Sequence, residues 1–183
     1  IELKRAYVNK ITYSDKTLFF ESGESMKYDQ LILAVGSKPN KFGWPGLDLK
    51  GVQGLYHYQD LESLEKATAR GIKRGVIIGG GLIGIELAEM LHSRGIKVTF
   101  LVRESSFWNK VLPKGESEMV NRLILKNGID LRLSSELKEI KSGPDGWVSK
   151  VITGDDEEIA CEFVGLTAGV SPNVDFLKES GLD

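Results

Sequence analysis

The spacing of apolar and polar positions changes along the chain, and each change predicts a different kind of element. Residues 1–35 alternate in short strand-like stretches, ending in the apolar run 31–35, with turn residues between them. Beyond residue 60, short all-apolar runs, typical of strands buried on both faces of a parallel sheet, alternate with helical spacings. This part predicts helices over 61–70, 82–94 and 113–127, buried strands over 74–80 and 97–102, and a third strand over 129–133. Asp60 is the expected N-cap of the first helix.

The pattern after residue 133 predicts antiparallel strands instead of another helix. Three strand-like stretches are separated by the turn-rich sequences SGPDG and TGDDE, and they lead into the apolar run 163–168. This order of elements is typical of a mononucleotide-binding half of a doubly wound sheet. We therefore expect an α/β fold: a Rossmann-like, three-layer dinucleotide-binding domain with a parallel sheet, in which an antiparallel β-meander replaces the next crossover helix.

One sequence pattern occurs twice in the chain. YDQLILAVGSKPN, residues 28–40, and CEFVGLTAGVSPN, residues 161–173, each combine an acid, an apolar run, a glycine, two spacers and Pro-Asn. Short antiparallel stretches precede both copies. We interpret the repeat as a duplication of one structural unit, against the alternative that two strand exits with glycine and proline turns agree by chance.

The strongest chemical signal is the sequence IIGGGLIGIE, between a predicted buried strand and a predicted helix. Gly79, Gly81 and Gly84 form a G-x-G-x-x-G pattern. In a dinucleotide-binding turn the first glycine permits the tight bend, the second lets a pyrophosphate approach the backbone, and the third lets the helix pack closely on the strand. The first N–H groups of the helix then bind the phosphates. In this strand–helix context the pattern favours dinucleotide binding over a merely flexible turn.

Other nucleotide sites also use glycine-rich turns. A Walker loop needs Gly-Lys followed by Ser or Thr, and these glycines lack that sequence. A methyltransferase shares the turn and its strand–helix context, so that class stays open. The choice between NAD and NADP is open too, because the second strand of the unit is followed by Arg103 and Glu104. A carboxylate suits the ribose 2′-OH of NAD and a cation suits the 2′-phosphate of NADP, while either residue is also an ordinary loop charge.

Composition narrows the classes of partner and compartment. The chain has 183 residues, of which 41% are hydrophobic, and 24 basic against 26 acidic residues give a net charge of only −2. This balance predicts neither a nucleic-acid partner nor binding to an acidic membrane surface. With Cys161 as the one cysteine there is no internal disulfide, and no apolar run is long enough to span a membrane, so we expect a cytoplasmic protein. Ile1 lies within a strand-like stretch, which indicates a piece of a longer chain.

The chain resembles the pyridine nucleotide–disulfide oxidoreductase family, flavoproteins with one FAD domain and one NAD(P)H domain. YDQLILAVGSKP is similar to the family's Y-D-x-L-[IV]-[IL]-A-T-G-[ST]-x-P stretch, VIIGGGLIGIELAEML to its NAD(P)H motif, and CEFVGLTAGVSPN to its later A-x-G-x-x-P-N stretch. The resemblance extends over nearly the whole chain and favours the NADH oxidase, CoA-disulfide reductase, nitrite reductase and ferredoxin reductase branch. It implies an oxidoreductase that passes hydride from NAD(P)H to FAD and then to an acceptor that the sequence does not identify.

The resemblance also implies a domain organisation. Residues 1–44 would be the end of the first FAD-domain segment, residues 45–169 the NAD(P)H domain, and residues 170–183 the return toward the FAD domain. The expected partners are a nicotinamide dinucleotide, NAD or NADP, and the rest of the parent flavoprotein, which would bind FAD and form a homodimer. The chain alone is expected to bind nicotinamide nucleotide without turnover. The alternative is a non-catalytic module that binds or senses a nicotinamide nucleotide.

The family pattern implies cofactor contacts at particular positions. Glu86 would lie near the nicotinamide, unless it is an ordinary solvated helix carboxylate, and Gly169 would approach the cofactor through its backbone. Val35 stands where the family has Thr, so a hydroxyl contact beside Gly36 is lost, and Val102 stands where NAD-type members have a strand-end Glu. The expected cofactor-binding residues are Val35, Gly36, Gly79, Gly80, Gly81, Leu82, Ile83, Gly84, Glu86, Val102, Arg103, Glu104 and Gly169.

No residue of this chain is expected to act as a catalytic acid or base, and no metal site is expected. Cys161 has no partner in a C-x-x-C pattern. In the family that the chain resembles, thioredoxin reductases carry such a pair in the NAD(P)H domain, so its absence argues against that branch. We expect Cys161 to be a small buried residue. His57 and His92 lack carboxylate or cysteine neighbours at ligand spacing. Trp108 either flanks an adenosine or packs under its own loop.

Overall fold

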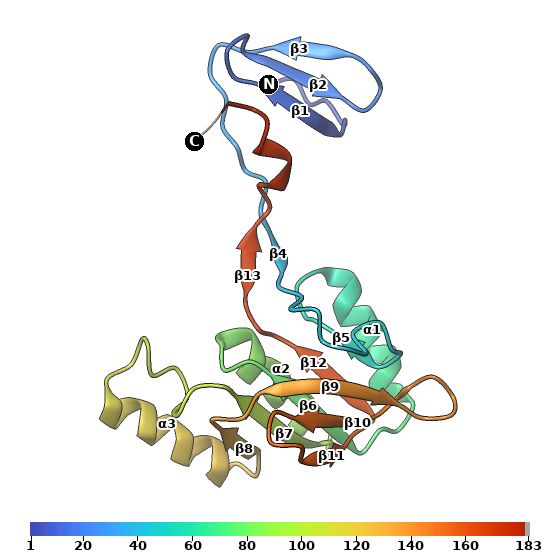
Figure 1. The fold of residues 1–183 in the computed structure, drawn as a ribbon, viewed down its shortest axis with the longest axis vertical. Helices are drawn as coiled ribbons and strands as arrows, with labels where there is room; N and C mark the ends of the chain where they lie inside the picture. The colour runs from blue at the N-terminus through green and yellow to red at the C-terminus, as the bar shows by residue number, and fades with distance from the viewer. Residues whose placement is uncertain (182–183) are drawn as a thin grey trace. The chain divides into compact units, whose positions relative to one another are not determined.

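The computed structural model describes residues 1–181 and divides into two compact units (Figure 1). One unit comprises Ile1–Lys38 and the chain from Ser171 onward, and the other comprises Pro39–Val170. The chain passes between the units through β4 (Ser37–Pro39) and β13 (Val170–Pro172), which pair as a two-stranded sheet. The whole glycine motif belongs to the larger unit.

A five-stranded parallel sheet forms the centre of the larger unit. Its strands lie in the order β5-β12-β6-β7-β8, and every neighbouring pair runs parallel. The strands are β5 (Val52–Gln53), β6 (Arg74–Ile78), β7 (Lys97–Val102), β8 (Asp130–Leu133) and β12 (Phe163–Leu166). From β6 the chain proceeds to β7 and β8 on one side, whereas β12 returns to the other side of β6.

Helices pack against one face of this sheet and a meander packs against the other. The helices are α1 (Tyr58–Ala69), α2 (Leu82–His92) and α3 (Lys114–Lys126), and the antiparallel meander consists of β9 (Leu137–Ser142), β10 (Val148–Thr153) and β11 (Glu158–Ala160). Ile77 and Phe100 belong to the apolar cluster on the helical side, and Val76, Ile78 and Leu101 belong to the cluster on the meander side. Each fully buried side chain of this size contributes about 1.5–3 kcal/mol. The expected α/β arrangement, a parallel sheet with an antiparallel meander, is confirmed.

Helix α1 begins earlier than its sequence indicates. Asp60 is not the N-cap, because the helix starts at Tyr58 and His57 occupies the cap position. The Asp60 carboxylate instead accepts hydrogen bonds from the backbone N–H groups of Tyr56 (2.8 Å) and His57 (2.9 Å). An acid in the first turn can reach back to N–H groups at the start of the helix, as the acid of a capping box does. Negative charge is also favourable near a helix N-terminus, so an acid suits both the N-cap and the first turn.

The smaller unit contains an antiparallel sheet of β1 (Val8–Thr12), β2 (Thr17–Phe20) and β3 (Ser25–Lys27), and the 3₁₀ helix η1 (Asp175–Leu177). The expected strand over 31–35 is wrong: no strand described within residues 1–181 includes this run, and Ile32 is 90% exposed. A segment that is apolar on both faces forms a strand only between neighbours that take up its backbone hydrogen bonds. The described sheets place no such neighbours beside it.

Candidate functional site

The glycine motif forms the turn between β6 and α2, at the carboxyl ends of the parallel strands. Gly79 follows β6 with φ of +113°, a conformation that residues with a side chain rarely adopt. Its N–H donates a hydrogen bond to the carbonyl of Leu101 on β7 (3.0 Å), and Gly81 is the N-cap of α2. The strand order reverses between β6 and β12, next to this turn. Such reversals are where open α/β sheets bind ligands.

The glycines of the turn have different steric surroundings. A Cβ on Gly84 would lie 2.3 Å from the carbonyl oxygen of Gly79, and a Cβ on Gly80 would lie 2.7 Å from Cγ1 of Val102. A Cβ on Gly81 would meet no atom within 4 Å. Gly84 therefore lets α2 pack closely on the turn, whereas Gly81 leaves the backbone at the helix N-terminus open to an approaching group.

Thr167, which follows β12, fixes the turn from the neighbouring strand. Its hydroxyl donates a hydrogen bond to the carbonyl of Ile78 (2.9 Å) and lies 3.2 Å from the carbonyl oxygen of Gly79. Its backbone N–H also donates to the carbonyl of Ile78 (2.8 Å). Each such hydrogen bond contributes roughly 1 kcal/mol to stability. Thr167 thus holds the carbonyl groups of Ile78, at the end of β6, and Gly79, in the turn, next to β12.

A cavity of about 520 Å³ opens at this edge of the sheet, within the larger unit. Its volume lies within the roughly 300–1,000 Å³ typical of pockets for small molecules and cofactors. The lining comprises Phe42, Trp44, Ile78, Gly79, Gly80, Gly81, Ile83, Leu101, Arg103, Glu104, Trp108, Asn109, Lys110, Ser135, Glu136, Leu137, Thr167, Ala168, Gly169 and Val170. The glycine turn after β6, the residues after β7 and those after β12 all contribute to the lining. The cavity therefore lies at the carboxyl ends of three adjacent strands, β12, β6 and β7.

Charged side chains line the cavity where the loop after β7 borders it. One carboxylate oxygen of Glu104 accepts hydrogen bonds from Lys110 Nζ (3.2 Å) and Arg103 Nη2 (3.3 Å), and Arg103 Nε lies 3.9 Å from the carboxylate of Glu136. Burial raises the pKa of Glu104, but the hydrogen bonds from Lys110, from the backbone and from Arg103 outweigh it, so its pKa lies below the ordinary value. Glu104 is therefore ionised at neutral pH, and neither sign of charge dominates this group.

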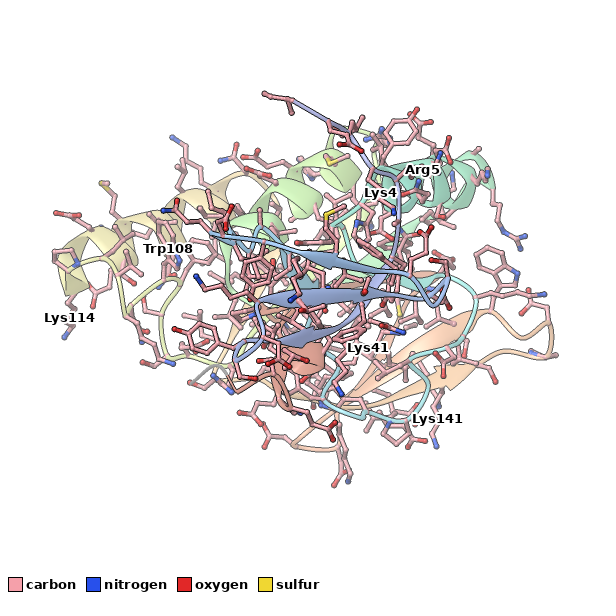
Figure 2. All side chains as sticks on the ribbon, turned by 90° about the horizontal axis from the view of Figure 1, so that it is seen from above. Lys4, Arg5, Lys41, Trp108, Lys114 and Lys141 are labelled. Atoms are coloured by element: carbon pink, nitrogen blue, oxygen red, sulfur yellow. The ribbon has the colours of Figure 1, made fainter. Side chains whose placement is uncertain are left out.

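Aromatic side chains also line the cavity. Trp108 projects from the loop between β7 and α3 (Figure 2), is half-buried, and packs against Phe107 with ring centroids 6.4 Å apart. Phe42 and Trp44 form an edge-to-face pair with centroids 5.2 Å apart. The sequence left open whether Trp108 borders a ligand or packs under its loop, and the structure places it in both situations: it lines the cavity and contacts the core.

The structure brings most of the predicted site residues together. Those that line the cavity are Gly79, Gly80, Gly81, Ile83, Arg103, Glu104 and Gly169. Gly84 lies in the first turn of α2, and Val102 is buried against Gly80. Their contacts with a cofactor stay a prediction.

Four predicted residues lie elsewhere. Leu82 and Glu86 are exposed on α2 and are outside the cavity lining, so the structure does not gather them with the other predicted residues. Val35 and Gly36 belong to the smaller unit, whereas every lining residue belongs to the larger one. The proximity of Glu86 to a nicotinamide also stays a prediction.

Several cavity residues were missed by the sequence reasoning. Thr167 and Ala168 directly precede Gly169 in the repeat, and Ser135 lies just beyond the carboxyl end of β8, so strand-end position was a usable signal for these three. Phe42 and Trp44 had no such signal, because the glycine- and proline-rich connector that carries them has no periodic pattern to indicate its path.

Cys161 lies outside this site. It is 1% exposed, and burial, followed by the nearby charge of Glu162, raises the pKa of its thiol to about 12. The thiol is therefore protonated and unreactive at neutral pH.

Within residues 1–181, no group of three or more His, Cys, Asp or Glu side chains is placed to hold a metal ion. No helix in the same range is long and apolar enough to cross a membrane.

A parallel sheet with helices on one face, a meander on the other and a glycine-rich turn at its reversal point matches the FAD- and NAD(P)-dependent oxidoreductases of known structure. Residues 2–183 match the family model described as pyridine nucleotide-disulphide oxidoreductase, and the chain belongs to that family. The resemblance inferred from the three sequence motifs is thereby confirmed.

Known relatives extend well beyond the matched region. The NADH oxidase of Enterococcus faecalis is 31% identical over 177 residues, which are 94% of this chain and 39% of that protein. A ferredoxin reductase from Rhodopseudomonas palustris superposes with a TM-score of 0.92 at 26% identity, covering 100% of this chain and 45% of its own. An FAD-dependent pyridine nucleotide-disulphide oxidoreductase from Desulfovibrio vulgaris is 30% identical with a TM-score of 0.78, covering 98% of this chain and 46% of its own. The chain thus spans less than half the length of these relatives.

Proposed function

We propose that the larger unit binds a nicotinamide dinucleotide, NAD or NADP, across the turn between β6 and α2. The observation that carries this proposal is the open backbone at Gly81, the N-cap of α2, on the wall of a cavity of about 520 Å³. The first N–H groups of a helix lack intrahelical acceptors and lie at the positive end of its macrodipole. A pyrophosphate supplies the oxygens and negative charge that suit this position.

The remaining lining divides into roles for the other parts of the dinucleotide. Arg103 and Glu104 follow the second strand of the unit, where the adenosine ribose of a dinucleotide is recognised. Glu104 is an acceptor for a 2′-OH, while Arg103 and Lys110 are donors for a 2′-phosphate, so these charges fit either cofactor. Gly169 lies beyond β12, on the other side of β6, and would approach the ligand through its backbone.

The parent protein is, in this proposal, an FAD-dependent oxidoreductase, in keeping with the names of its relatives. Residues 45–169 would form the NAD(P)H domain, and residues 1–44 and 170–183 would be parts of the FAD domain. A nicotinamide held across the glycine turn would supply a hydride, for which FAD in the rest of the parent protein would be the acceptor, and the final electron acceptor is not identified. The task of the residues described here is to bind and orient the dinucleotide, with no acid or base among them.

Calorimetric titration of the 183-residue chain with NADH and NADPH tests the proposal. At least one of them is expected to bind with one site per chain, and ADP-ribose, which shares the adenosine and pyrophosphate, is expected to compete. The purified chain is expected to retain no flavin and to oxidise no NAD(P)H. Absence of binding by both nucleotides would contradict the nucleotide site, whereas firm retention of FAD by this chain would contradict the division into domains.

A further inference from the structure

We propose that Trp108 is a preformed stacking surface for the adenine of the dinucleotide, and that two polar side chains of α3 hold it in place. This inference rests on the nucleotide site proposed above and assigns a binding role within it to a residue of the loop between β7 and α3.

The backbone of Trp108 is strained. Its φ is +58°, a left-handed conformation that is an outlier for a bulky aromatic residue. Such residues persist only where their surroundings hold them, and they cluster at functional sites. Here the carbonyl of Trp108 accepts hydrogen bonds from the N–H groups of Val111 and Leu112, both at 2.9 Å. The turn that follows the tryptophan therefore fixes one side of the strained residue.

Helix α3 fixes the other side through Phe107. The Phe107 N–H donates a hydrogen bond to Oδ1 of Asn121 (2.9 Å), and its carbonyl accepts one from Oγ of Ser117 (2.6 Å). The amide of Asn121 also donates to Oγ of Ser106 (2.7 Å), and the hydroxyls of Ser106 and Ser117 are hydrogen-bonded to each other. Both backbone groups of the residue before Trp108 are thus held by side chains of α3.

Ser117 occupies a position where α3 would normally bury an apolar side chain. Ser117 is fully buried, and Asn121 lies one turn further along the same side of the helix, facing the loop. A buried hydroxyl contributes little hydrophobic stabilisation, and its burial is tolerated only because its hydrogen bonds are made. Helix α3 therefore uses its inner face to fix the loop backbone around Phe107, while the ring of Phe107 packs in the core 5.9 Å from that of Phe100.

The consequence is an aromatic ring held on the cavity wall beside the residues expected to meet the adenosine ribose. Trp108 lines the same cavity as Arg103 and Glu104, and it is only half-buried. In a dinucleotide the adenine is attached to that ribose, so a base extending past the end of β7 meets the loop that carries Trp108. Stacking a base on an aromatic side chain strengthens binding roughly 5- to 150-fold, and a ring fixed in advance loses little freedom on binding.

The experiment separates the adenine end of the ligand from the nicotinamide end. ADP-ribose contains adenosine and pyrophosphate without nicotinamide, whereas nicotinamide mononucleotide lacks the adenine. Calorimetry with Trp108→Ala is expected to show affinity for ADP-ribose reduced about tenfold or more, and affinity for nicotinamide mononucleotide changed less than about twofold. Trp108→Phe, which retains a ring, is expected to stay within about threefold of the wild-type affinity for ADP-ribose. Trp147→Phe is the matched control, because Trp147 lies under the guanidinium of Arg70 (3.8 Å) and outside this cavity.

Fluorescence provides a test that does not depend on the folding of Trp108→Ala. The double variant Trp44→Phe/Trp147→Phe leaves Trp108 as the one tryptophan of the chain. Its emission is expected to be quenched by ADP-ribose and by AMP in a saturable manner, but not by ribose 5-phosphate, which carries no base. Unchanged emission at saturating ADP-ribose, or wild-type affinity of Trp108→Ala for ADP-ribose, would overturn the role of Trp108 while leaving the nucleotide site in place. A wild-type chain that binds neither NADH, NADPH nor ADP-ribose would overturn both proposals.

Discussion

The backbone N–H of Asn40 donates a hydrogen bond to the carbonyl of Gly169 (3.0 Å), and these two residues belong to different copies of the repeated Gly-x-x-Pro-Asn pattern. The reciprocal bond also exists, since the N–H of Asn173 donates to the carbonyl of Gly36 (3.0 Å). The asparagine of each copy thus binds the glycine of the other, at either end of the β4–β13 pair. The repeat is therefore more than a duplicated strand exit, because its two copies are bonded to each other.

Gly169→Ala tests how strongly this reciprocal pair depends on glycine. Gly169 has φ of +92°, and a Cβ there would lie 3.3 Å from Nδ2 of Asn40. Because a left-handed conformation costs a residue with a side chain roughly 1–2 kcal/mol, we expect the free energy of unfolding to fall by about that amount. Urea denaturation measures the change, and Gly115→Ala is the control, since a Cβ at that helical position meets no atom within 4 Å. Equal stability of Gly169→Ala and wild type would show that this backbone conformation is not required.

Two substitutions within the glycine turn are expected to have different effects. In Gly84→Ala the new Cβ would lie 2.3 Å from the carbonyl oxygen of Gly79, so α2 must shift away from the turn and we expect a loss of roughly 2 kcal/mol or more in unfolding free energy. In Gly81→Ala nothing lies within 4 Å of the new Cβ, so stability should change by less than about 0.5 kcal/mol.

Gly81→Ala is instead expected to reduce nucleotide affinity. The methyl group of Gly81→Ala would stand in the open approach to the N-terminus of α2, so affinity for NADH or NADPH should fall about tenfold or more while the melting temperature is unchanged. Calorimetry and thermal denaturation of the same samples measure both quantities. Undiminished binding by Gly81→Ala would show that the pyrophosphate does not approach the backbone at this position.

The larger unit was predictable from sequence because its signals are local. The strands β6 and β7 are short, mostly apolar runs, β8 alternates charged and apolar residues, and the glycine turn needs only its own spacing and the strand and helix on either side. The run 31–35 has the same apolar character but forms no strand, because strand formation depends on neighbours that lie elsewhere in a sheet. Local composition cannot supply that information.

The cavity was predictable chiefly where its residues follow a strand, and for the loop residue Trp108 the sequence left two roles open. Arg103, Glu104 and Gly169 follow predicted strands, and the structure places all three on the cavity wall. Lys110 and Trp108 lie within an irregular loop whose path depends on hydrogen bonds to Ser117 and Asn121 of α3. Those bonds connect residues that are ten or more positions apart, and no periodicity indicates them.

Exchanging the charges after β7 tests how the site distinguishes NADPH from NADH. Arg103 is exposed and its contacts with Glu104 (3.3 Å) and Glu136 (3.9 Å) are those of a surface ion pair, so its guanidinium is available to a 2′-phosphate at little cost. Arg103→Ala should reduce affinity for NADPH by about tenfold and leave affinity for NADH within about twofold. Glu104→Gln removes a negative charge from the same group and should raise affinity for NADPH.

Titration of each variant with both nucleotides decides this point. Arg122→Ala is a matched control, because Arg122 is an exposed arginine of α3 that lies outside the cavity lining. Equal losses of affinity for NADH and NADPH in Arg103→Ala would mean that the arginine does not recognise the 2′-phosphate. A loss confined to NADH in Glu104→Gln would instead identify this carboxylate as the acceptor for the 2′-OH.

The buried thiol of Cys161 is expected to affect stability at alkaline pH. Its pKa in the folded chain is about 12, chiefly because of burial, whereas an unfolded cysteine ionises near pH 8.5. A pKa raised by folding means that the unfolded state loses the proton first, so this contribution is fully present below about pH 8.5 and decreases as the pH rises toward 12. The decrease should approach about 1.4 kcal/mol per pH unit within that window. Urea denaturation at pH 7 to 10.5 should therefore show a steeper decline in the free energy of unfolding for the wild type than for Cys161→Ala. Parallel declines in the two proteins would contradict this prediction.

Native chain at pH 8 should also react with a thiol reagent far more slowly than unfolded chain does, because the reactive thiolate forms only after the strand region around Cys161 opens.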